Sequence, residues 1–178
     1  AIMELRHGEF KEIFADQKEE AVFVRDVIVE TDQEMLIPDN YVSNIQERLS
    51  LYTELDSINT EEVLSLFAER LRDRFGRIPT QVNELMEGLR LRWVAKNLGF
   101  EKVVIKGGKL RCFFVANPQS AFYESAFFNK LLKILPELTL TFGISLKQSN
   151  NSLMVIKEKM HTLGQTRDLL ERIYENLK

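Results

Sequence analysis

Nucleophilic or metal-binding chemistry in this chain would have to use its one cysteine and its two histidines. Cys112 lies between Leu110 and Phe114 in an alternating stretch, and His7 and His161 are far apart in the sequence. A Cys112–His161 pair could serve a nucleophilic enzyme. A cysteine between apolar neighbours on one strand face is, however, typical of a buried structural residue, and the spacing matches no zinc motif. We therefore expect no catalytic residue, no metal and no cofactor.

Glycines and paired acidic residues offer no stronger chemistry. Gly107-Gly108 lacks the Lys-Ser/Thr ending of a phosphate loop and the further glycines of a dinucleotide motif. A two-residue Gly-Gly link between strand-like segments is typical of a hairpin. The pairs Glu61-Glu62 and Glu19-Glu20 could do acid–base work, but a helix start and a charged linker explain them better.

The densest polar segment is Glu69-Arg70-Leu71-Arg72-Asp73-Arg74-Phe75-Gly76-Arg77. Arg70, Arg74 and Arg77 are spaced at i, i+4 and i+7, which predicts one helical face, with Glu69 and Asp73 on an adjacent face. A phosphate-binding stripe is one interpretation, but the nearby acids lower its positive potential and no aromatic residue interleaves with it. A solvated face and a protein-docking surface are the alternatives, because arginine pairs well with carboxylates at interfaces.

Charge is distributed unevenly along the 178 residues, whose net charge is −3. Residues 1–100 hold 12 Lys+Arg against 20 Asp+Glu, whereas residues 101–178 hold 12 against 7. The overall balance argues against a dedicated nucleic-acid binder. The two halves could simply be solvated faces of opposite sign, or the acidic half could dock on a basic partner. One cysteine and the lack of a long apolar run favour a cytoplasmic protein.

The elements that must position these residues divide the chain into an arm and one domain. Residues 1–20 predict a short tether helix and a charged linker, and the domain proper should start at Ala21. The start Ala1-Ile2-Met3 has no initiator methionine, which fits a piece cut from a longer protein. Residues 21–99 should hold three helices after a strand pair, in which 22–30 would pair with 35–37.

The three expected helices follow from caps and apolar spacing. The first should start with the capping box Ser43-x-x-Gln46 and run to about Leu55. The second should follow Thr60 and end at Gly76, and the third should span about 80–98. Their expected inward residues are Ile45, Leu49, Tyr52 and Leu55, then Val63, Phe67, Leu71 and Phe75, then Val82, Leu85, Leu89 and Trp93.

The second half, residues 100–178, predicts two strand-strand-helix units. In the first, strands at 102–106 and 109–115 flank Gly107-Gly108 and precede a helix at about 120–135. In the second, strands at 138–147 and 153–157 precede a helix capped by Thr162-x-x-Gln165. The alternation of apolar and polar residues over 138–147 indicates a half-buried strand. The fold class is therefore α+β, a three-helix segment followed by a small antiparallel sheet covered by helices.

Five short motifs occur in fixed order over residues 37–100. They are Ile37-Pro38-Asp39-Asn40-Tyr41-Val42, Arg48-Leu49-x-Leu51-Tyr52, Leu71-x-Asp73-Arg74-Phe75-Gly76-x-Ile78-Pro79, Leu91-Arg92 and Leu98-Gly99-Phe100. In these motifs the chain resembles the C-terminal domain of bacterial transcription-repair coupling factor. The Asp-Arg-Phe-Gly-x-x-Pro core is the most specific element. Residues 101–178 fit in length and pattern only, and residues 1–20 resemble the tether that leaves the preceding motor domain.

The resemblance implies a parent protein that is an ATP-driven DNA translocase, which displaces stalled RNA polymerase and recruits UvrA. It implies that the C-terminal domain is not the motor but packs on a UvrB-like module, covers the UvrA-binding surface and restrains the motor. On this view Glu69, Asp73 and Arg74 are docking candidates, with Arg70 and Arg77 beside them. Arg70 stands where the family often has an acidic residue, which would weaken or rewire the contact.

Three functions thus remain open. The first is a non-catalytic autoinhibitory docking domain, in which Tyr41, Arg48 and Tyr52 brace the three-helix segment rather than touch a partner. The second is an accessory nucleic-acid-binding domain that uses the three arginines and the basic C-terminal half. The third is a small enzyme, for which the sequence offers no nucleophile–base constellation.

Overall fold

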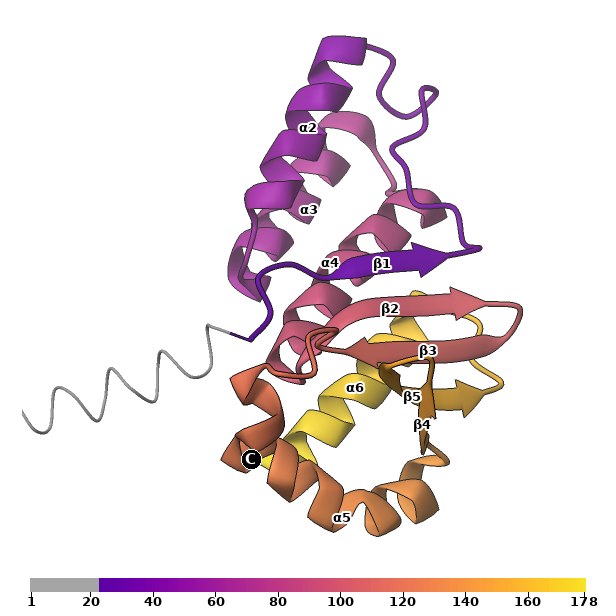
Figure 1. Ribbon diagram of the computed structural model, residues 1–178. Coiled ribbons are helices and arrows are strands. Elements are labelled where there is room, and N and C mark those ends of the chain that lie inside the picture. Colours follow the sequence, from indigo (N-terminus) through magenta and orange to yellow (C-terminus); the bar gives the residue numbers. More distant parts are fainter. Residues whose placement is uncertain (1–22) are drawn as a thin grey trace, which may run out of the picture.

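The computed structural model describes residues 23–178, so the predicted tether and linker, residues 1–20, lie outside the described range. The described elements form a helical part, built on α2, α3 and the first half of α4, and a sheet part, in which α5 and α6 accompany the strands (Figure 1). Their bounds are β1 Ile28–Thr31, α2 Ile45–Ser57, α3 Glu61–Phe75, α4 Thr80–Asn97, β2 Phe100–Lys106, β3 Lys109–Phe114, the 3₁₀ helix η1 Ala121–Glu124, α5 Ala126–Phe142, β4 Ser145–Ser149, β5 Ser152–Glu158 and α6 Leu163–Leu177. No described helix is both long and apolar enough to cross a bilayer.

The strands form one five-stranded sheet in the order β1-β2-β3-β5-β4. The pairs β2–β3, β3–β5 and β5–β4 are antiparallel, and β2 and β3 are joined at Gly107-Gly108 as predicted. The predicted α+β class and the two strand-strand-helix units are confirmed. The predicted pairing of 22–30 with 35–37 is wrong, because β1 pairs in parallel with β2, with Val29 opposite Val103. A parallel partner far along the chain leaves no local signal in the sequence.

The strand predicted at 138–147 is wrong over its first half. Its first half is the end of helix α5, and β4 begins only at Ser145. Leu138 is buried while Leu140 is 88% exposed. Positions 138 and 142 share a face in a helix as well as in a strand, because they are four apart, so short alternation fits both. Gly143, with φ 69° and its N–H donating to the Thr139 carbonyl, ends the helix.

Two apolar cores meet along helix α4. Its first half contributes Val82 and Met86 to a core formed with α2 and α3. Its second half contributes Leu91 and Val94 to the core under the sheet, where Cys112 is fully buried. Burial raises the pKa of the Cys112 thiol, as expected for a structural cysteine. Helix α4 therefore joins the helical part to the sheet part, and it packs closely on α6 (Figure 1).

The apolar stripe expected on α2 is partly wrong. Leu51 and Leu55 are the buried residues of this helix, whereas Ile45 and Leu49 are exposed. The helix begins one residue later than the capping box predicted, because Asn44 rather than Ser43 accepts the hydrogen bond from the backbone N–H of Glu47. On α3, Val63 is likewise exposed and Leu64 takes its place in the core. Exposed leucines and isoleucines blur a helical stripe.

Candidate functional site

Helix α3 carries four of the five predicted docking residues, and both of its ends are fixed. Its N-cap Thr60 accepts a hydrogen bond from the backbone N–H of Val63. At the other end, Gly76 has φ 87°, a value that side-chain-bearing residues rarely adopt. The Tyr41 hydroxyl contacts the carbonyl oxygens of Leu71 and Gly76 at 3.2 and 2.9 Å. The Asp-Arg-Phe-Gly motif therefore lies on a braced helix end.

Residues of the other motifs fasten the loop before α2. The backbone N–H of Ile37 donates to the Tyr52 hydroxyl at 2.6 Å, and the Arg48 guanidinium donates to the Val42 carbonyl at 2.8 Å. Together with Tyr41, these contacts agree with the predicted role of bracing the three-helix segment. They also explain why these polar residue types occur at these positions.

The structure separates the predicted docking residues into two sets. Arg70 and Arg74 turn sideways from α3 and form ion pairs with Glu54 and Glu47 of α2. Their guanidinium groups also lie over the rings of Phe67 and Phe75, at 5.7 and 4.8 Å from the centroids. These arginines link α3 to α2, because α2 supplies the carboxylates that a partner would otherwise provide.

The acids occupy the outer face of α3, which points away from the helical core. Glu62, Leu66, Glu69 and Asp73 follow each other at i, i+4, i+7 and i+11, and all four are exposed. Leu66 is 60% exposed, a large apolar side chain in the middle of three carboxylates. Within residues 23–178, no ion pair is formed by Glu62, Glu69 or Asp73. We call these four residues the acidic stripe.

Arg77 does not belong to the predicted arginine face. Helix α3 ends at Phe75, and Gly76 redirects the chain, so Arg77 lies exposed beyond the helix end. The spacing i, i+4 and i+7 places residues on one face only while the helix continues. The structure thus leaves two of the three arginines paired with α2 and the third off the helix.

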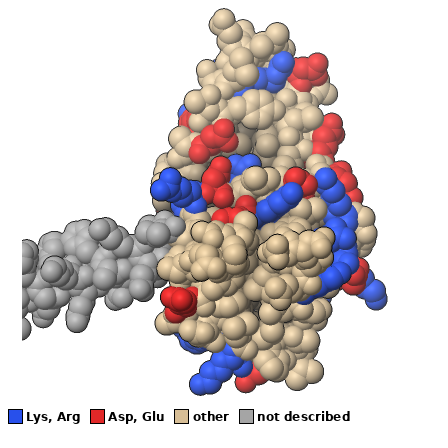
Figure 2. Space-filling view, in the orientation of Figure 1, with Lys and Arg blue, Asp and Glu red and all other residues tan. Residues whose placement is uncertain are grey.

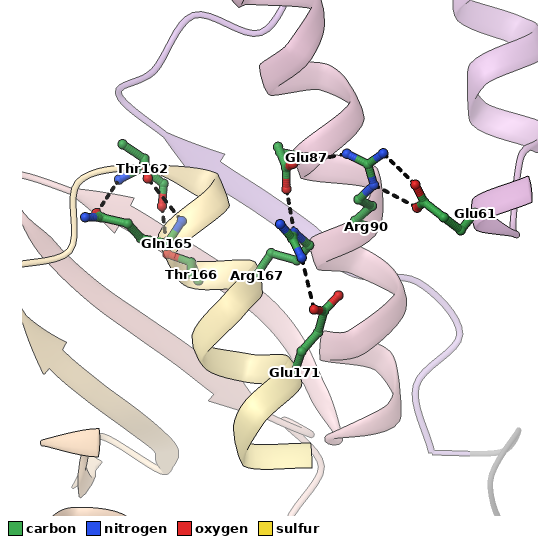
Figure 3. Close-up of polar contacts among 8 residues, drawn as sticks. All are labelled: Glu61, Glu87, Arg90, Thr162, Gln165, Thr166, Arg167 and Glu171. Carbon is green, nitrogen blue, oxygen red and sulfur yellow. Dashed lines mark hydrogen bonds and ion pairs between the residues drawn. The ribbon is translucent and has the colours of Figure 1, made fainter. Parts of the chain in front are cut away.

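A network of charged residues links the two parts of the fold (Figure 3). On α4, Arg90 donates two hydrogen bonds to Glu61 of α3, at 2.7 and 2.8 Å, and one to Glu87 at 3.0 Å. Glu87 also accepts from Arg167 of α6 at 2.6 Å, and Arg167 donates to Glu171 at 3.0 Å. The network therefore connects three helices, α3, α4 and α6.

Four residues of the network line an open hollow of about 740 Å³: Glu61, Arg90, Arg167 and Glu171. Hydrogen bonds from Arg90 hold the pKa of Glu61 below its usual value, which favours the ionised, paired state. Burial and the charge of Glu87 raise the pKa of nearby Glu84. Along the wall of the hollow Glu61 pairs with Arg90 and Arg167 pairs with Glu171, an arrangement that fits a clamp between helices, whereas Glu62 forms no ion pair within residues 23–178. Within residues 23–178, no group of three or more His, Cys, Asp or Glu could hold a metal.

Sequence spacing alone predicts only part of this network. Two of its contacts, Glu87–Arg90 and Arg167–Glu171, have helical i,i+3 and i,i+4 spacing and could have been found. The contacts from Glu61 to Arg90 and from Glu87 to Arg167 join residues 29 and 80 positions apart. Only the packing of α4 on α6 and α3 brings them together.

We expect Glu87→Gln to lower the free energy of unfolding by about 1–2 kcal/mol, because two arginines lose their shared carboxylate at a largely buried position. Urea denaturation of the 178-residue chain measures this value. The matched control is Glu175→Gln, which removes a carboxylate paired with Lys178 at the exposed end of α6. That change should leave the free energy of unfolding almost unchanged. Equal effects of the two substitutions would contradict a clamp role.

Comparison with known proteins agrees with the motifs and with the fold. The model of the TRCF domain family matches residues 31–125. The transcription-repair-coupling factor of Rickettsia bellii is 27% identical over 124 residues, which cover 70% of this chain and 10% of that protein. The Escherichia coli protein of the same name is 36% identical over 75 residues, or 42% of this chain and 6% of that protein. The chain thus matches a tenth or less of the length of these relatives.

A solved structure shares the fold. The crystal structure of the C-terminal domain of a transcription-repair coupling factor superposes with a TM-score of 0.63 and 18% sequence identity, covering 86% of this chain and 96% of that one. The family match spans the braced helix end, the acidic stripe and strands β2 and β3. Because it covers more than half of the 178 residues, the chain belongs to the TRCF domain family.

Proposed function

We propose that this chain is the non-catalytic, autoinhibitory C-terminal domain of a cytoplasmic transcription-coupled DNA repair translocase. In this role it docks on the UvrB-like module of its own parent protein, masks the UvrA-binding surface and restrains the motor. RNA polymerase and UvrA are then partners of the parent rather than of this domain. The observation that carries the proposal is the acidic stripe on a braced helix, within the segment that matches the family.

The chemistry of the acidic stripe indicates the kind of surface it fits. Three carboxylates surround Leu66, so a complementary surface would be basic and would hold an apolar pocket. Glu69 and Asp73 are the predicted residues best placed for this contact. Arg70 and Arg74 would support it indirectly, by fixing the orientation of α3 on α2. Where the family often has an acidic residue, this chain has Arg70, which forms an ion pair with Glu54 of α2.

The geometry weakens the alternative of an accessory nucleic-acid-binding domain on this helix. That alternative needs a stripe of exposed arginines free to meet phosphates. Two of the three arginines instead face carboxylates of α2, and the accessible outer face of α3 is acidic. Such a face repels a phosphate backbone.

Removing the domain from the full-length parent tests the proposal. We expect a version that ends near Phe14 to hydrolyse ATP faster and to bind UvrA more tightly, by on the order of tenfold, within the usual range of coupling between sites. A tether raises the effective concentration of the docking surface, so weak contacts suffice to keep the parent closed. Steady-state ATPase assays and a UvrA pull-down measure the two effects. No change in either would refute autoinhibition.

A further inference from the structure

The sheet has a second face that neither core covers. Residues that alternate with the core residues on β2, β3 and β5 point to this face, which we call the open sheet face. Its apolar centre consists of half-buried Phe113 and Ile156 beside Val104 and Met154, which are each only 8% exposed; none of the four belongs to the apolar core beneath the sheet or to the helical core. The strand register places Phe113 opposite Met154 and Arg111 opposite Ile156. The four side chains therefore form one continuous patch.

Cations surround and enter this apolar centre. They are Lys102 and Lys106 on β2, Lys109 and Arg111 on β3, and Lys147 on β4. Two acids accompany them: Glu30 lies 3.3 Å from Lys102 and 3.4 Å from Lys106, and Glu158 lies 3.5 Å from Lys109. The open sheet face thus has three more cations than acids in a chain whose net charge is −3. Lys and Arg gather over the strands at the right of the space-filling view, with red side chains beside them (Figure 2).

Arg111 is the central charge of this arrangement. The register places it between Val104 on β2 and Ile156 on β5, within the apolar centre. Within residues 23–178, neither Arg111 nor Lys147 forms an ion pair, whereas Lys102, Lys106 and Lys109 each do. A half-buried guanidinium beside apolar side chains is typical of an interface residue that pairs with a carboxylate of its partner.

We propose that the open sheet face binds an acidic protein segment that carries apolar side chains between its carboxylates. Apolar side chains of the partner would cover Phe113 and Ile156, the half-buried residues of the apolar centre. Its carboxylates would meet Arg111 and Lys147. This surface is separate from the acidic stripe of α3, has the opposite charge, and so selects a different partner.

The composition of the face favours a protein over single-stranded nucleic acid. Nucleic-acid-binding sheets use several exposed aromatic rings as stacking platforms. Here three of the four central residues are aliphatic. The one ring, Phe113, has the Lys102 ammonium 5.8 Å from its centroid, over the surface that a base would need.

Binding experiments on the 178-residue chain test the proposal with defined probes. The first probe is a short peptide that alternates glutamate and leucine; its controls alternate lysine with leucine or glutamate with serine. A single-stranded oligothymidylate is the nucleic-acid probe. We expect the glutamate–leucine peptide to bind most tightly and to shift the amide NMR signals of Arg111, Phe113 and Ile156.

Charge reversal locates the contact. Arg111→Glu and Lys147→Glu should each weaken the glutamate–leucine peptide by roughly tenfold, because each replaces an attraction by a repulsion. The matched control, Lys133→Glu, changes an exposed lysine of α5, away from this face, and should leave the affinity unchanged. Circular dichroism confirms that each variant is folded, and exposed Lys147 remains informative if the Arg111 variant unfolds. Tighter binding of oligothymidylate on this face, peptide signals elsewhere, or equal losses in all three variants would overturn the proposal.

Discussion

Gly99→Ala is expected to lower the free energy of unfolding by about 3 kcal/mol, through backbone strain of about 1–2 kcal/mol and overpacking of a similar size. Gly99 has φ 83°, and a β-carbon there would lie 2.3 Å from ring atoms Cε2 and Cζ of Phe122. The ring has little room to move, because Phe122 is almost fully buried. Urea denaturation of the 178-residue chain, followed by circular dichroism, gives the value.

The rigidity of Phe122 comes from the aromatic cluster around it. The centroids of Phe23, Phe114, Tyr123 and Phe128 lie 5.2–5.8 Å from its own. A shift of Phe122 would therefore disturb the first strand-strand-helix unit and the turn from α4 into β2. Such packed clusters transmit strain instead of absorbing it.

Gly107→Ala is the matched control for this prediction. Gly107 also has a positive φ, 60°, but a β-carbon there would meet nothing within 4 Å. The control therefore measures backbone strain alone, and we expect a cost of about 1 kcal/mol. If both substitutions lower the free energy of unfolding equally, contact with Phe122 plays no part in the cost of the Gly99 substitution.

The second large effect is expected from charge reversal in the acidic stripe. The double substitution Glu69→Arg and Asp73→Arg in the full-length parent should raise ATPase activity and UvrA binding by roughly tenfold if the stripe docks on a basic surface. Both residues are exposed and form no ion pair within residues 23–178, so the fold should remain intact. Unchanged activity in a folded variant would remove the acidic stripe as the docking surface.

Two comparisons make this test specific. The double substitution Glu124→Arg and Glu137→Arg reverses two exposed acids near and on α5 and alters net charge equally. It should leave both activities at the level of the unmodified parent. If removal of the whole domain activates the parent but the Glu69 and Asp73 variant does not, the domain inhibits through another surface. Removal of the domain thus tests whether it inhibits the parent, and the Glu69 and Asp73 variant tests whether it does so through the acidic stripe.

The sequence predicted those elements whose signals are local. The Thr162-x-x-Gln165 capping box, the Gly107-Gly108 hairpin and the end of α3 at Gly76 are all confirmed. Caps and tight turns depend on residues within a few positions of each other, so composition and spacing suffice. The same reasoning failed for 138–147, where helix and strand give the same short pattern.

The sequence by itself determined the fold class, the buried state of Cys112 and the motifs that mark the family. Only the tertiary structure decided which charged side chains remain free to meet a partner. An ion pair between two helices joins residues far apart in the chain, so the spacing of charges in the sequence does not reveal it. The tertiary structure turned Arg70 and Arg74 toward α2 and left Glu69 and Asp73 outward. It also assembled the Glu87 network and gathered Arg111 and Lys147 on one sheet face, because strand register joins residues far apart in the chain.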